Sequence, residues 1–198
     1  MIRLAHRGDV GLLPAIERAA GAAFAGYLQQ VGLRAELLDV VTSIEELEHA
    51  QKAGHLWVAT VDDTPVGFAL VSEVGGFAHI EEIDVLPSHG RRGIGSTLLQ
   101  AVSEWAIGAG LPGVTLSTFR DVPWNAPFYE RRGFVIVEAR DLSEEHVRLR
   151  AEEASGGLRA DLRVMMVRRV QSPRPSASPQ VRQGAVASAD PASQTPSR

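Results

Sequence analysis

A glycine-rich segment with two adjacent arginines is the part of the chain best suited to chemistry. It runs from Gly90 to Ser96 with the sequence GRRGIGS, between an apolar strand-like stretch and a helix-like one. Glycines let the backbone approach a ligand closely and adopt positive φ, and N–H groups at a helix N-terminus converge on an anion. Arg91 and Arg92 add full positive charges, and the hydroxyl of Ser96 adds a hydrogen-bond donor. The segment therefore predicts a binding site for a pyrophosphate group.

Two other kinds of phosphate site do not fit this sequence. A P-loop needs a lysine directly after its last glycine, and the only lysine of the chain is Lys52. A dinucleotide-binding fold needs a parallel βαβ unit that opens with three glycines, whereas the strands before this turn read as antiparallel. Both are excluded.

The strand expected before the turn, at 77–86, carries four titratable side chains. They are His79, Glu81, Glu82 and Asp84. Alternate residues of a regular strand share a face. The first two are thus expected on the face of Ile83 and Val85, and the other two on the opposite face, unless a bulge intervenes. Carboxylates and imidazoles at such positions are candidate general bases.

A tyrosine on a short predicted helix, at 123–132, is a candidate proton donor. Tyr129 is followed four residues later by Gly133 and Phe134, where the next strand is expected to begin. Its hydroxyl, with a pKa near 10, can protonate a departing thiolate, whose conjugate acid titrates near 8.5.

The elements that must position these residues alternate between strand and helix patterns. Strands are expected at 2–6, 55–61, 65–72, 77–86, 114–119, 134–140 and 158–170. Helical regions are expected at 9–30, 37–53, 94–109 and 123–132, and the charged stretch before the last strand reads as loop or helix. This order predicts an α/β fold with a mixed, mostly antiparallel central sheet flanked by helices.

Composition limits the kinds of function. The 198 residues carry a net charge of −4, which disfavours nucleic acid and favours a small cationic substrate. The chain has no cysteine, no signal peptide and no apolar run long enough for a membrane helix, so we expect a cytoplasmic protein without membrane attachment. Residues 1–170 are expected to form one domain, and the Ser-, Pro-, Ala- and Gln-rich residues 171–198 a disordered tail.

The glycine-rich segment resembles the coenzyme A signature of the GNAT superfamily of N-acetyltransferases, which reads Gln or Arg, two residues, Gly, one residue, Gly or Ala. Gly93 and Gly95 match it, and Gly90 stands in place of the Gln or Arg. The spacing from Tyr129 to Gly133-Phe134 resembles the second motif of the family. The resemblance covers roughly residues 1–140 and implies the GNAT-like acyl-coenzyme A N-acyltransferase fold.

The same resemblance implies a set of site residues. Acetyl-coenzyme A would be held by the backbone of the strand before the turn, with an N–H near Val85 stabilising the oxyanion, and by the turn itself. Where the family often has Asn seven positions before the tyrosine, Val122 stands here, and Asn125 is the candidate replacement. The implied cofactor-binding residues are Ile83, Asp84, Val85, Arg91, Arg92, Gly93, Ile94, Gly95, Ser96 and Asn125.

The implied reaction is direct attack of a primary amine on the acetyl thioester, without a metal. The base would be Glu81 or His79, four and six positions before Val85, with Glu82 left open, and Tyr129 would be the general acid. The expected partners are acetyl-coenzyme A and an amine acceptor, with no nucleic acid and no membrane; the acceptor's identity is open, and so is the oligomeric state, a homodimer included.

Two other functions compete with this one. A non-catalytic domain that senses acyl-coenzyme A would have the same phosphate turn, but it would not need an acid and a base on either side of the thioester. A protein-interaction module would rest only on the segment after Gln171, and we rank it last.

Overall fold

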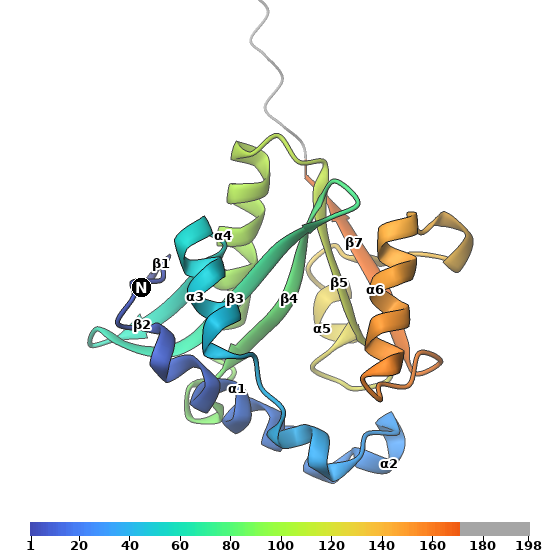
Figure 1. Ribbon diagram of the computed structural model, residues 1–198, viewed down its shortest axis with the longest axis horizontal. Helices are drawn as coiled ribbons and strands as arrows, with labels where there is room; N and C mark the ends of the chain where they lie inside the picture. Colours follow the sequence, from blue (N-terminus) through green and yellow to red (C-terminus); the bar gives the residue numbers. More distant parts are fainter. Residues whose placement is uncertain (171–198) are drawn as a thin grey trace, which may run out of the picture.

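A seven-stranded mixed sheet forms the centre of the protein (Figure 1). The computed structural model describes residues 1–170, and the tail predicted over 171–198 lies outside the described residues. The strands are β1 (Ile2–Leu4), β2 (Leu56–Val61), β3 (Thr64–Val74), β4 (Phe77–Val85), β5 (Gly113–Phe119), β6 (Val135–Ile136) and β7 (Arg163–Arg169). They lie in the order β1-β2-β3-β4-β5-β7-β6, and only β4 and β5 are parallel. The predicted mixed, mostly antiparallel sheet is confirmed.

Helices cover both faces of this sheet. They are α1 (Leu13–Gly21), α2 (Leu28–Val31), α3 (Ile44–Ala53), α4 (Ile94–Gly108), α5 (Ala126–Glu130) and α6 (Glu144–Ser155). Short 3₁₀ turns lie at Val10–Leu12, Ala22–Gly26, Ala35–Asp39, Pro87–His89 and Ala139–Asp141. In Figure 1, α1, α3 and α6 lie on the near side of the sheet, with α4 and α5 behind it. Each of these described helices is too short or too polar to cross a membrane.

Three groups of buried apolar residues hold these layers together. On one face, Leu98, Val102 and Ala106 of α4 pack against the sheet. On the other face, α1 and α3 contribute Leu13 and Leu47. A third, smaller group includes Val31, Phe119 and Val122, with Phe24 and Tyr27 packed against it, and ties the N-terminal helical segment to the end of β5.

Several elements differ from the sequence-based expectation or decide between alternatives that it left open. The helical region expected at 37–53 is a 3₁₀ turn at Ala35–Asp39 followed by α3, and the strand expected at 158–170 is β7, which is shorter. The helical region expected at 9–30 is broken into α1, α2 and 3₁₀ turns, because Phe24 and Tyr27 pack on Trp124. The strand expected at 134–140 is only β6, an edge strand that pairs with β7 over two residues. The charged stretch is the helix α6, which Ser143 caps by accepting a hydrogen bond from the His146 N–H.

A close approach of β3 and β4 depends on a glycine. A Cβ at Gly67 would lie 2.6 Å from the carbonyl oxygen of Asp84 and 3.3 Å from the Cα of Val85. Both are backbone atoms, so the neighbouring strand itself would have to move.

We therefore expect Gly67→Ala to destabilise the protein by about 1–3 kcal/mol through overpacking. Gly108→Ala is the matched control, because a Cβ added there would meet no atom within 4 Å outside its own helix backbone. That change should be neutral or stabilising by up to about 1 kcal/mol. Thermal unfolding measures both variants, because each kcal/mol of stability change should shift Tm by roughly 2–4 °C. Equal Tm values for the two variants would contradict the tight approach at Gly67.

Candidate active site

The parting of β4 and β5 opens the groove that contains most of the candidate residues. These parallel strands pair only where Ala78–Ile80 meets Val114–Leu116. Beyond Ile80, β4 still pairs with β3 on one side, but its edge toward β5 has no strand partner among the described residues. Ile83, Asp84 and Val85 border the groove along this edge. An extended ligand can pair with such an unpaired backbone edge.

A β-bulge changes the face on which the β4 carboxylates lie. Val71 pairs with Ile80 and Leu70 pairs with Glu82, so Glu81 is an extra residue without a partner on β3. Ile80 and Ile83, three residues apart, consequently both pack on the α4 side of the sheet. The expectation of a regular strand, with Glu81 on the face of Ile83 and Val85, is thus wrong.

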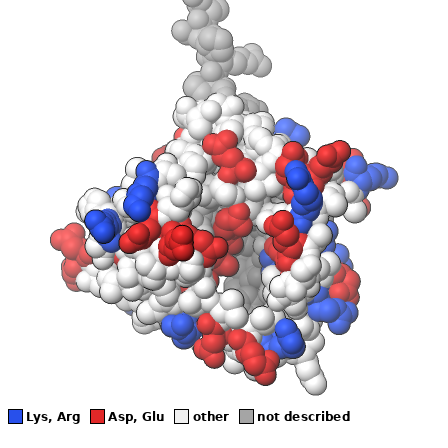
Figure 2. All heavy atoms as spheres, in the orientation of Figure 1, with Lys and Arg blue, Asp and Glu red and all other residues white. Residues whose placement is uncertain are grey.

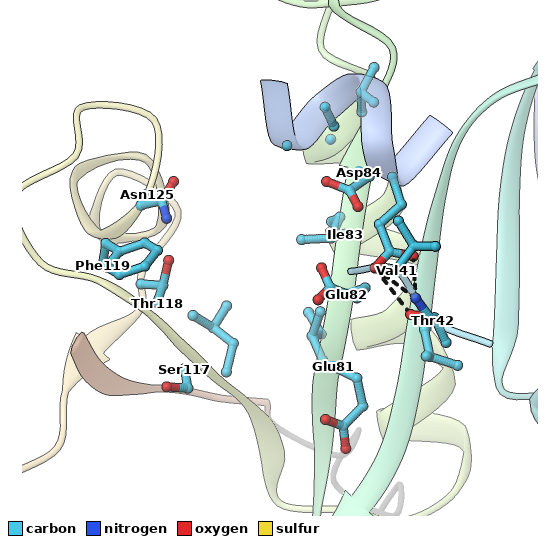
Figure 3. A pocket seen from close by; sticks show the side chains of 18 of the residues that line it. Val41, Thr42, Glu81, Glu82, Ile83, Asp84, Ser117, Thr118, Phe119 and Asn125 are labelled. Carbon is cyan, nitrogen blue, oxygen red and sulfur yellow. Dashed lines mark hydrogen bonds between the residues drawn. The ribbon is translucent and has the colours of Figure 1, made fainter. Parts of the chain in front are cut away.

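The bulge places three carboxylates on the side of α1, α3 and α6. Glu82 and Asp84 pair with Leu70 and Phe68, two residues of the apolar group on that side. Glu81 accepts a hydrogen bond from the hydroxyl of Ser72 at 2.5 Å. All three carboxylates line the groove, and Figure 3 shows those of Glu82 and Asp84 directed into the gap, with Asn125 and Thr118 across from them.

Burial and like charges raise the pKa values of these groups. Burial, together with the charges of Asp84 and Glu17, raises the pKa of Glu82 well above its ordinary value. Burial and the charge of Glu17 raise the pKa of Asp84 to about 8. Burial also raises the pKa of Glu81, although Ser72 donates a hydrogen bond to its ionised form. A raised pKa makes each of these carboxylates a stronger base than an ordinary one.

Glu17 of α1 is a further carboxylate of this acidic region, and no sequence pattern predicted its place there. Its carboxylate accepts hydrogen bonds from the backbone N–H of Thr42 at 3.0 Å and from the Thr42 hydroxyl at 3.3 Å. Burial nevertheless raises the pKa of Glu17. The two hydrogen bonds fix the carboxylate beside Glu82 and Asp84.

Tyr129 reaches the same groove from the other side of the gap. Its side chain is 9% exposed and packs against Phe128 and Phe134. Its hydroxyl has no hydrogen-bond partner within residues 1–170, and the residue lines the groove. Burial, and then the charges of Asp84 and Glu82, raise the pKa of Tyr129. The hydroxyl of Tyr129 therefore stays protonated near neutral pH.

The glycine-rich turn forms the basic end of the groove. Gly93 has a φ of 84° and begins α4 without a side-chain cap, so the first N–H groups of the helix have no side-chain partner there. Arg91 has a φ of 59° and lines the groove with Gly93, Ile94, Gly95 and Ser96. Arg92 is exposed and lies outside the groove lining. Asn125, which precedes α5, lines the groove opposite β4.

Arg132 is a further cation at this end, and the sequence motifs did not indicate it. Its Nε and one terminal nitrogen donate to the hydroxyl of Ser96 at 2.8 and 2.6 Å. Its guanidinium lies 3.6 Å from the ring centroid of Phe128. The hydroxyl of Ser96, expected to donate to a phosphate, thus accepts from Arg132. A signal was present in the adjacent Arg131-Arg132 pair after Tyr129, but only the fold brings it to the start of α4.

His79 does not lie in the groove. Its side chain is 1% exposed, and its Nδ1 lies 2.9 Å from the hydroxyl of Thr115. Burial, with the nearby charges of His146 and Arg163, lowers its pKa to about 3. The structure therefore brings Glu81, Glu82 and Tyr129 together, and places His79 in the core. Within the described residues 1–170, no three His, Asp or Glu side chains are grouped to hold a metal.

Comparisons with known proteins agree with this geometry. Residues 27–134 match the acetyltransferase (GNAT) family. S-(2-succino)cysteine N-acetyltransferase of Bacillus subtilis is 38% identical over 74 residues, which are 36% of this chain and 45% of that protein. The chain thus spans less than half the length of this relative.

Two solved structures share the fold. N-acetylglutamate synthase from Neisseria gonorrhoeae, complexed with coenzyme A and N-acetyl-glutamate, matches 86% of this chain and 35% of its own with a TM-score of 0.64 and 22% identity. PaiA N-acetyltransferase from Thermoplasma acidophilum, in complex with coenzyme A, is the second. The match covers 86% of this chain and 98% of that one, with a TM-score of 0.60 and 18% sequence identity. The family match covers more than half of the sequence, and the chain belongs to the acetyltransferase (GNAT) family.

Proposed function

We propose that the protein transfers an acetyl group from acetyl-coenzyme A to a primary amine by direct attack. The observation that carries the proposal is one groove with a proton donor, Tyr129, on one side and carboxylates with raised pKa values, Glu81 and Glu82, on the other. The edge of β4 beyond Ile80, which has no strand partner within residues 1–170, borders the same groove. A sensor of acyl-coenzyme A has no need of this arrangement.

The residues of the turn and of β4 fit the proposed co-substrate. The uncapped start of α4, with Arg91 and Arg132 beside it, suits a pyrophosphate, and Arg92 adds charge at the surface. The free backbone edge at Ile83, Asp84 and Val85 suits a pantetheine arm, with an N–H near Val85 as oxyanion donor and Asn125 across the gap. Acetyl-coenzyme A, when bound, supplies the acetyl thioester.

The carboxylates of β4 handle the protons of the amine. An alkylammonium has a pKa near 10.4, and only its neutral form attacks. We propose that Glu81 or Glu82 takes this proton, either directly or through water. Glu82 is favoured over Glu81 because its carboxylate is directed into the gap (Figure 3), whereas that of Glu81 is held by the hydroxyl of Ser72. His79, buried and neutral, serves as a structural residue of the core.

Tyr129 completes the proton balance. The new bond joins the amine nitrogen to the acetyl carbon, and the carbon–sulfur bond breaks. The hydroxyl of Tyr129 gives its proton to the sulfur as negative charge develops there, and this transfer is completed only together with the return of a proton to the tyrosine, because a phenol is a weaker acid than a thiol. The proton released by the amine nitrogen restores the tyrosine through the groove.

Charge reversal tests the phosphate end. The double variant Arg91→Glu/Arg92→Glu should bind coenzyme A at least about tenfold more weakly, a loss of about 1.4 kcal/mol, measured by calorimetry. Arg140→Glu/Arg148→Glu is the matched control, because both arginines are exposed and lie outside the groove. Equal affinities for the two double variants would remove the turn from the binding site.

Removal of one hydroxyl tests the proton donor. Tyr129→Phe should lower turnover by roughly 10²–10⁴ and leave acetyl-coenzyme A binding almost unchanged, because proton donation matters in the transition state. Turnover is measured as release of the coenzyme A thiol from acetyl-coenzyme A in the presence of each of a panel of amines, which includes the S-(2-succino)cysteine named for the relative. Full turnover in this variant would make Tyr129 structural. Tight coenzyme A binding by wild type without turnover of any amine would favour a sensor.

A pH series identifies the base. Glu82→Gln and Glu81→Gln should be compared with Glu104→Gln, an exposed control on α4 outside the groove. Loss of the true base lowers kcat/KM most near neutral pH, where the amine is protonated, and is partly rescued toward the amine's own pKa of about 10.4. A deficit that is the same at every pH in both variants would mean that neither carboxylate is the base.

A further inference from the structure

Three aromatic side chains from distant parts of the sequence lie together along one side of the groove. Phe24 belongs to the 3₁₀ turn Ala22–Gly26, Phe119 ends β5, and Trp124 lies two residues before α5. The ring centroid of Phe24 is 5.5 Å from that of Phe119 and 5.7 Å from that of Trp124, and the rings of each pair are tilted by 58°. All three residues line the groove, and we call them the aromatic wall.

Trp124 is the member of this wall that packing does not cover. Phe119 is 5% exposed and belongs to the buried apolar group that ties the N-terminal helical segment to β5. Trp124 is 38% exposed, although Tyr27, which lies outside the groove lining, holds it through an edge contact with a centroid distance of 4.7 Å. A fixed aromatic surface that stays open in a groove is available to a ligand.

The aromatic wall lies close to the candidate proton donor. The carbonyl oxygen of Asn125, the residue after Trp124, accepts a hydrogen bond from the backbone N–H of Tyr129 at 3.2 Å, so one helical turn separates the two. Tyr129 is more than nine-tenths buried, and its hydroxyl has no hydrogen-bond partner within residues 1–170. An unpaired buried hydroxyl is costly unless a ligand or water satisfies it. The wall thus adjoins the place where a ligand of this groove should end.

The two sides of the gap differ in chemistry. Figure 3 shows Phe119 and Asn125 on one side and the carboxylates of Glu82 and Asp84 on the other. Figure 2 shows acidic side chains around the central hollow on the side of α1, α3 and α6. An ammonium complements the carboxylates, and an apolar ring complements the aromatic wall.

We propose that the acceptor is an arylalkyl primary amine, with its amine between the β4 carboxylates and Tyr129 and its aryl ring against the aromatic wall. This inference rests on the proposed function. Tilted and edge-to-face aromatic pairs are stabilised beyond the apolar area that they bury. The wall therefore distinguishes an aryl ring from a saturated ring of similar size, and Trp124 is a specificity-determining residue.

Matched acceptors test the ring. Calorimetry with the coenzyme A-loaded protein should show 2-phenylethylamine binding at least about tenfold more tightly than ethylamine, which lacks only the ring. The saturated analogue 2-cyclohexylethylamine should bind at least about twofold more weakly than 2-phenylethylamine. Thiol release with acetyl-coenzyme A should give the same order in kcat/KM.

Substitution of one side chain tests the aromatic wall. Trp124→Ala should reduce the preference for 2-phenylethylamine over ethylamine at least about fivefold, mainly through KM, and leave coenzyme A affinity unchanged. Trp124→Phe keeps a ring and should retain most of the preference. Val147→Ala is the control, since Val147 is 51% exposed on α6 and lies outside the groove.

Two results with these variants would overturn the role of Trp124. One is the same preference in Trp124→Ala as in Val147→Ala. The other is a loss of coenzyme A affinity in Trp124→Ala, which would assign the tryptophan to the co-substrate.

The outcomes also separate this inference from the function on which it rests. Equal affinities for 2-phenylethylamine and ethylamine, or for the two ring-bearing amines, would overturn the arylalkyl acceptor even if amines are acetylated. Tighter binding of 2-phenylethylamine without thiol release from any amine would support the aromatic site and contradict acetyl transfer.

Discussion

The early separation of β4 from β5 is the constraint on which the site depends. Parallel pairing stops after Ile80, although β5 continues to Phe119. On its other edge, β5 pairs with β7 along its whole length, so the strand keeps its hydrogen bonds without β4. Continued pairing would have closed the groove and occupied the backbone edge that the proposed co-substrate needs. Buried backbone groups must find a partner, and an edge left free inside a groove is poised for a ligand.

The bulge at Glu81 turns this opening into a polar site. It puts two consecutive glutamates on the same side of the sheet, where a regular strand would have directed one of them into the apolar layer under α4. Glu82 and Asp84 are then held near each other and near Glu17, with raised pKa values. Such crowding destabilises the folded protein, and proteins commonly retain this kind of strain where function requires it.

Local patterns were enough to predict some of this site. The GRRGIGS turn and the spacing from Tyr129 to Phe134 are short-range features, and the fold places both on the groove. The bulge has no such signature, because His79 and Glu81 alternate as in any regular strand. The pairing of Arg132 with Ser96 joins residues 36 positions apart, and the position of Glu17 depends on how α1 lies on the sheet. These are tertiary contacts, which local propensity does not encode.

The distribution of charge in the groove suits the two unlike molecules of the proposed reaction. Basic groups gather where α4 begins, and carboxylates gather under α1, α3 and α6, with the parted strands between them. A polyanionic co-substrate is attracted to the first end and repelled by the second, and a cationic acceptor experiences the reverse. The proposed co-substrate and the proposed acceptor would then occupy different ends of one groove and meet beside the hydroxyl of Tyr129. The net charge of −4 is thus less informative than its separation into two ends, and that separation favours a reaction between a phosphate-bearing donor and an ammonium.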